Sequence, residues 1–63
     1  MNKNPVRMAE EMLGIRPGEL AKRRPNLFLA ILDAEQYCIK LGGRLVSRQA
    51  VAAIVVSVRE DSP

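Results

Sequence analysis

The sequence contains no histidine and no tryptophan, and Cys38 is its single cysteine. A lone thiol cannot form a disulfide within the chain, and without histidine or a second thiol the usual ligands of a structural zinc site are missing. We therefore expect no metal and no cofactor. Cys38 lies in an apolar run, where a free cysteine behaves as a small hydrophobe, and we expect a reducing, cytoplasmic location.

Aromatic residues and long apolar runs are also scarce. Phe28 and Tyr37 are the two aromatic residues, which argues against binding of single-stranded nucleic acid by base stacking. The longest apolar stretches, LFLAIL and AVAAIVV, are far shorter than the roughly 20 residues that cross a bilayer. The initial MNKNPVR is not followed by the apolar region of a secretory signal. We expect no contact with a membrane.

Catalysis has little support in these residues. The chain has no Gly-rich phosphate loop and no serine or cysteine beside an obvious base. Glu10 and Glu11 are adjacent carboxylates, which point in different directions from a helix. We expect both to be solvated on an exposed face, and the sequence predicts that the protein is not an enzyme.

The length and charge of the chain suggest that it associates with other molecules. Its 63 residues form a single small domain, 1–63, and a domain of this size buries only about 60% of the surface that its unfolded chain exposes. We expect a homodimer, or a stable contact with another protein, to supply the missing stability. The net charge is +3, and most basic residues lie in the middle of the chain, which favours nucleic acid or another acidic partner. These residues are Arg16, Lys22, Arg23, Arg24, Lys40, Arg44 and Arg48.

The hydrophobic periodicity predicts an all-α fold, a small bundle of three main helices with one short helical turn. The helices are expected at about 5–13, 26–41 and 47–59, and the turn at 17–23. Asn4 before Pro5 is a favourable N-cap, and Gly14 can end the first helix in the left-handed conformation.

In the middle helix, Leu27, Ile31, Ala34, Cys38 and Leu41 fall on one face. In the last helix, Ser47 is a candidate N-cap. The β-branched residues that follow leave a strand open as the alternative for residues 52–58. The final EDSP is expected to be disordered.

One segment resembles a known family. Residues 43–54, GRLVSRQAVAAI, resemble the turn and recognition helix of small helix-turn-helix DNA-binding regulators of the phage and plasmid type. The resemblance implies that Val46, Val51 and Ile54 are buried. It also implies that the exposed polar residues of the segment bind double-stranded DNA, because arginine can recognise guanine, glutamine can recognise adenine, and serine can hold a phosphate. These candidate residues are Arg44, Ser47, Arg48 and Gln49.

A second basic group, Lys22, Arg23 and Arg24, precedes a proline. It can contact the phosphate backbone of DNA, or it can be a solvated linker that keeps a small apolar protein soluble.

Two functional hypotheses therefore stay open. The first is a small DNA-binding transcriptional regulator that acts through its C-terminal helix, as a homodimer in which the last two helices are arranged as in a helix-turn-helix. The second is a non-enzymatic helical protein-binding module, such as a small inhibitor, anti-activator or adaptor of the phage or plasmid type. Basic residues gathered on one face favour the first hypothesis. Scattered basic residues, together with an exposed apolar patch, favour the second; the residues of that patch are Leu27, Phe28, Leu29, Leu32 and Val56.

Overall fold

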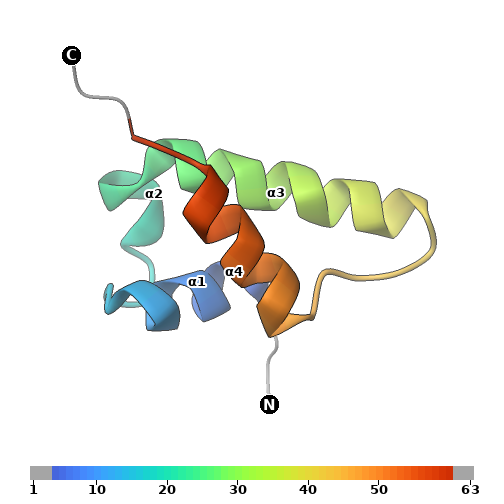
Figure 1. Cartoon of the computed structure of the whole chain (residues 1–63), viewed down its shortest axis with the longest axis horizontal. Helices are drawn as coiled ribbons and strands as arrows, with labels where there is room; N and C mark the ends of the chain where they lie inside the picture. The colour runs from blue at the N-terminus through green and yellow to red at the C-terminus, as the bar shows by residue number, and fades with distance from the viewer. Residues whose placement is uncertain (1–3, 61–63) are drawn as a thin grey trace.

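The computed structural model describes residues 4–60, and within that range the chain is all-helical. The predicted all-α fold is confirmed. Of the four final residues EDSP that were expected to be disordered, 61–63 lie outside the described residues, whereas the expectation is wrong for Glu60, which accepts hydrogen bonds from the backbone of Asn26 and Leu27. Figure 1 shows α3 as the long helix of the molecule, with the other helices gathered around its first half. The helices are α1 (Pro5–Leu13), α2 (Leu20–Arg23), α3 (Pro25–Lys40) and α4 (Arg48–Ser57).

The ends of α1 follow from its flanking residues, as predicted. The side chain of Asn4 accepts hydrogen bonds from the backbone N–H groups of Val6 at 2.8 Å and Arg7 at 3.3 Å. Pro5 occupies the first turn, where its missing N–H is not needed. Gly14 ends the helix with φ of 68°, a left-handed conformation that glycine adopts without steric cost.

The second helical segment is shorter than predicted. Residues 17–23 were expected to form one helical turn, but α2 occupies only Leu20–Arg23, after a turn in which the N–H of Glu19 bonds the carbonyl of Arg16 at 3.0 Å. Arg24 then leaves the helical conformation, with φ −135° and ψ 69°, because the ring of Pro25 disfavours it. A new helix, α3, starts at that proline.

The last element is a helix, and the alternative strand over residues 52–58 is wrong. Ser47 caps α4 by accepting the N–H of Ala50 at 3.2 Å, which satisfies a donor that a helix start leaves free. The helical segment ends at Ser57, and Val58 is extended. A capped start and the alanines before the valines therefore outweigh the strand preference of the β-branched residues.

The helices enclose a small apolar core. Figure 1 shows α4 crossing in front of the molecule, where it packs on both α1 and α3, while α2 packs against α3 near its start. Every helix, and also the connection between α3 and α4, contributes to the core. The buried apolar residues are Met8, Ala9, Leu20, Leu27, Ile31, Leu45 and Val51.

Some packing predictions were wrong, for identifiable reasons. Val46 is 53% exposed and Leu45 is buried in its place, because the Leu45 backbone N–H is held by Glu35 on α3. Leu41 is exposed because α3 ends one residue earlier, at Lys40. Ile54, also expected inside, is half-buried against the core.

Candidate binding surface

Three glutamates hold the backbone in place, and none of these roles was predicted. The first is Glu10, which was expected to be solvated but is only 2% exposed. Its Oε2 accepts the backbone N–H groups of Gly18 at 2.9 Å and Leu20 at 3.2 Å. The carboxylate therefore caps the start of α2 from a neighbouring helix, in place of a local cap. Glu11, by contrast, is exposed as expected.

The second glutamate, Glu35, fixes the connection between α3 and α4. Its Oε2 accepts a hydrogen bond from Nε of Arg44 at 2.6 Å, and its Oε1 accepts the backbone N–H of Leu45 at 3.1 Å. Glu35 is buried, whereas the Arg44 side chain is 69% exposed. The carboxylate is satisfied on both oxygens, so the pair presents the arginine, and not the acid, to solvent.

The third glutamate, Glu60, joins the C-terminal segment to the start of α3. It accepts the N–H groups of Asn26 at 3.1 Å and Leu27 at 2.9 Å, and Arg24 lies 3.5 Å from it. Burial alone would raise the pKa of this carboxyl. The backbone hydrogen bonds from Leu27 and Asn26, together with the Arg24 guanidinium, outweigh that effect and hold the pKa below its ordinary value.

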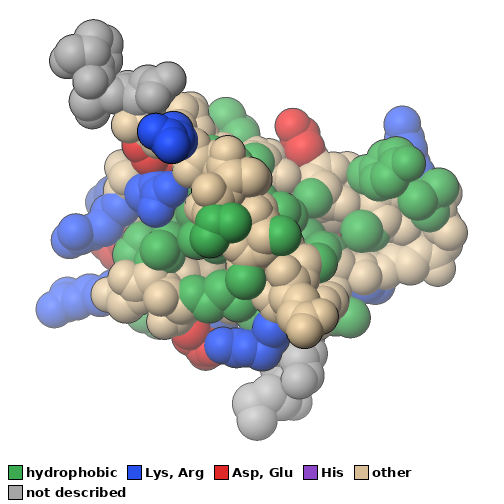
Figure 2. Space-filling model, viewed as in Figure 1, with side chains coloured by type: hydrophobic (Ala, Val, Ile, Leu, Met, Phe, Trp, Pro, Cys, Tyr) green, Lys and Arg blue, Asp and Glu red, His purple; other side chains and the backbone are tan. Residues whose placement is uncertain are grey.

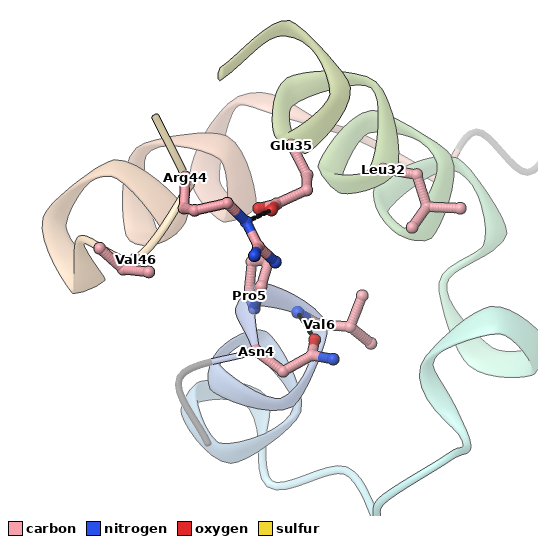
Figure 3. A pocket seen from close by; sticks show the side chains of 7 residues that line it. All are labelled: Asn4, Pro5, Val6, Leu32, Glu35, Arg44 and Val46. Atoms are coloured by element: carbon pink, nitrogen blue, oxygen red, sulfur yellow. Dashed lines mark hydrogen bonds and ion pairs between the residues drawn. The ribbon is translucent and has the colours of Figure 1, made fainter. Parts of the chain in front are cut away.

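A cavity of about 310 Å³ opens where α1, α3 and the α3–α4 connection meet. Figure 3 shows Arg44 reaching from the connection toward the start of α1, with Val46 on one side and Leu32 on the other. Glu35 is the one acidic residue of the lining, and its charge is already balanced by Arg44. The lining residues are Asn4, Pro5, Val6, Leu32, Glu35, Arg44 and Val46.

Exposed apolar side chains extend this cavity along α3. Leu29, Leu32 and Ile39 are 58%, 40% and 44% exposed. Leu29 and Leu32 are three residues apart and Ile39 follows two turns later, so the three side chains form one row on the helix surface. From Leu29 to Ile39 the row is about 15 Å long. We call the cavity together with this row the α3 groove.

The predicted DNA-contacting residues near α4 are close together, but several have partners within the chain. Arg44 binds Glu35, and Ser47 caps the helix. Arg48 lies 3.7 Å from Glu11, with both side chains 62% exposed. Gln49 is exposed. Residues 41–47 connect α3 to α4, which is longer than the turn of about three or four residues in a helix-turn-helix.

The second basic group lies elsewhere. Lys22 and Arg23 are exposed at the end of α2. Arg24 is not part of an exposed linker, because its Nη2 donates to the carbonyl of Val58 at 3.2 Å and its side chain is only 26% exposed. Arg24 therefore places this group near the C-terminal end of α4, roughly the 15 Å length of that helix from Arg48. In Figure 2, Lys and Arg side chains lie at separate places around the edge of the face shown.

The described part of the chain offers few residues for other kinds of site. Residues 4–60 contain no group of three or more His, Cys, Asp or Glu side chains placed to hold a metal ion. Cys38 is half-buried and free. No helix within this range is long and apolar enough to cross a membrane.

Comparisons of the chain with family models, with curated proteins and with solved structures find no match. Its function is therefore argued from the surface itself. The apolar patch considered from the sequence is present only in part, because Leu29 and Leu32 are exposed but Leu27 is fully buried. The cavity beside them was not predicted, although two signals in the sequence pointed to this surface. Glu35 is an acid within an apolar stripe, and Leu29 is a large apolar residue on the polar side of the same helix.

Proposed function

We propose that the protein is a non-enzymatic helical protein-binding module, a small inhibitor, anti-activator or adaptor, that binds its partner through the α3 groove. The observation that carries the proposal is the row of exposed apolar side chains beside a cavity that is itself lined by Val6, Leu32 and Val46. Contiguous exposed apolar surface on a small protein is typical of an interaction site.

The strength of this contact can be estimated from the exposed side chains. Leu29, Leu32, Ile39 and Val46 are each about half exposed, between 40% and 58%. Fully burying such a side chain contributes about 1.5–3 kcal/mol, so covering the remaining halves contributes roughly 3–6 kcal/mol in total. Association itself costs about 4–15 kcal/mol. The apolar contacts alone therefore support a weak complex, and a stable one requires polar contacts as well.

Position-specific cross-linking tests the proposal. A photo-reactive benzoylphenylalanine replaces Leu32 in cells that express the chain, and in a matched control it replaces Val56, which is 81% exposed on α4. We expect a cross-linked protein from position 32 alone, and its loss when Val46→Asn is added. An adduct of two copies of the chain would identify the module as a homodimer. No adduct, or the same adducts from both positions, would contradict the proposal.

DNA binding is the second candidate, and one observation favours it. The first turn of α4 is open to solvent, with Gln49 exposed and Arg48 held only by an exposed pair with Glu11. Such a pair is worth about 0–1 kcal/mol, so a phosphate can replace Glu11. In this case the chain is a transcriptional regulator that docks α4 in the major groove as a homodimer. Both candidates are proposed to act in the cytoplasm.

A gel-shift titration with random duplex DNA at two salt concentrations tests this second candidate. DNA binding predicts retardation at low salt that weakens steeply as salt rises. It also predicts that Arg48→Ala weakens specific binding by about 1–3 kcal/mol without a change in melting temperature. No retardation at low salt would exclude the candidate.

A further inference from the structure

We infer that the partner of the α3 groove is an acidic amphipathic helix, one that places an apolar row in the groove and acidic residues against Arg44. The inference rests on the proposed protein-binding function and specifies the chemistry of the partner. Three properties of the groove support the inference: its length, its apolar surface and the charge at its edge.

The dimensions of the groove fit a short helix. The apolar row from Leu29 to Ile39 is about 15 Å long, which is the length of about ten helical residues. Its members lie at the spacing with which one helix contacts another, and the neighbouring Val46 widens the apolar surface from the α3–α4 connection. A helix laid in a groove is recognised by apolar anchors three, four and seven residues apart.

The charge at the edge of the groove determines whether an acidic or a basic partner is preferred. Arg44 lines the cavity, and its side chain is 69% exposed although its Nε is bound to Glu35. Within residues 4–60, the two Nη groups of Arg44 donate no hydrogen bond. On the α1 side, Arg7 is not a lining residue, and its Nε lies 3.7 Å from Oε1 of the buried Glu10. An acidic partner therefore finds the exposed guanidinium of Arg44 in the lining and no free carboxylate there.

The same charge disfavours a second copy of the chain as the occupant. Each copy carries a net charge of +3, and a symmetric dimer across this groove places the same Arg44 surfaces near each other. Like charges at an interface oppose association. A helix with acidic residues beside its apolar row contributes the polar contacts that the apolar side chains alone do not supply.

Two synthetic helical peptides of about 14 residues test the inference, with leucines spaced to match the α3 row. One carries glutamate at every position beside the leucines, and the other carries lysine there. Fluorescence anisotropy measures their binding to the full chain. We expect the glutamate peptide to bind at least about tenfold more tightly, because each charged position changes from attraction to repulsion. This preference shrinks in high salt.

Variants of the chain locate the binding. Val46→Asn weakens binding of the glutamate peptide, whereas Val56→Asn, at an apolar position on α4 that is 81% exposed against 53% for Val46, does not. Arg44→Gln removes most of the charge preference, whereas Lys40→Gln, outside the cavity lining, retains it. Because Arg44→Gln also leaves the buried Glu35 without its partner, Arg44→Lys serves as a second variant, which keeps the charge and is expected to keep the preference.

The other outcomes each overturn the inference. If both peptides bind equally and both lose binding in Val46→Asn, the protein-binding function stands, but the inference that the partner is acidic is refuted. Binding of neither peptide also overturns the inference, while the cross-linking experiment decides the proposed function separately. Displacement of the glutamate peptide by duplex DNA shows general attraction of polyanions, and a stable dimer that excludes the peptide shows that a second copy fills the groove.

Discussion

Removal of the Glu10 carboxylate is expected to destabilise the fold far more than removal of its neighbour, Glu11. The Glu10 side chain is 3% exposed, and its Oε2 accepts two backbone N–H groups, from Gly18 and Leu20. A hydrogen bond to a charged group contributes about 1.5–3 kcal/mol. The two bonds share one oxygen and are not additive, so we expect Glu10→Ala to cost about 2–4 kcal/mol.

The cost is large for a chain of this size. A core in a domain below about 70 residues rarely supplies more than about 3–5 kcal/mol, so Glu10→Ala removes most of the stability. Glu10→Gln keeps an acceptor oxygen but loses its charge. Because charge-assisted hydrogen bonds are about twice as strong as neutral ones, it should cost about 1–2 kcal/mol.

Thermal unfolding followed by circular dichroism checks this series. One kcal/mol changes the melting temperature of a domain of about 60 residues by about 4–8 °C. Glu10→Ala should therefore lower it by at least about 8 °C or abolish the transition. The matched control is Glu11→Ala, whose exposed pair with Arg48 at 3.7 Å is worth less than about 1 kcal/mol. Equal melting temperatures for Glu10→Ala and Glu11→Ala would refute the capping role of Glu10.

Three further predictions concern stability. Because the pKa of Glu60 is lowered in the fold, the contribution of its carboxylate to the free energy of unfolding is complete above the ordinary pKa of a glutamate and is lost as pH falls through the lowered pKa. In urea unfolding, the stability of Glu60→Gln should therefore fall less steeply in acid than that of the unchanged chain. The same acid dependence in both would contradict the contact with Leu27. Ile31→Asp places an unpaired charge at a fully buried position, and calorimetry should find no cooperative unfolding. An unchanged unfolding transition would refute the placement of Ile31 in the core. Ser47→Ala removes the cap of α4 and should cost about 1 kcal/mol, measured by chemical denaturation, with exposed Ser57→Ala as the control; equal values would show that the cap contributes nothing.

The features predicted correctly from the sequence depend on neighbouring residues. Asn4, Gly14 and Ser47 act on helix ends within three residues of themselves, so the local sequence is sufficient to place them. The apolar spacing of Leu27 and Ile31 likewise identifies the buried face of α3 directly.

The features that were missed depend on residues distant in the sequence. Glu10 and Glu35 bind backbone groups eight to ten residues away, and Glu60 binds groups more than thirty residues away. No local pattern separates such carboxylates from solvated ones. The burial of Leu45 instead of Val46 is of the same kind, because Glu35 on α3 fixes the position of Leu45 through its backbone N–H.

The candidate site was predicted only in part, for a related reason. Sequence reasoning selected basic residues by their chemistry, but Arg24 and Arg44 are bound to Glu60 and Glu35 within the fold. Whether an arginine is free or paired depends on the tertiary structure. The α3 groove arises from the meeting of three segments, the start of α1, the middle of α3 and the following connection, which periodicity along a single helix does not reveal.

Nuclear magnetic resonance of the backbone amides tests the central claim most directly, by titrating the full chain with the glutamate peptide and, in parallel, with a short DNA duplex at the same salt concentration. The account predicts that the peptide shifts the amides of Val6, Leu32 and Val46, while the duplex leaves the chain unchanged. Shifts at Arg48 and Gln49 on addition of DNA, with none in the groove on addition of peptide, would contradict it.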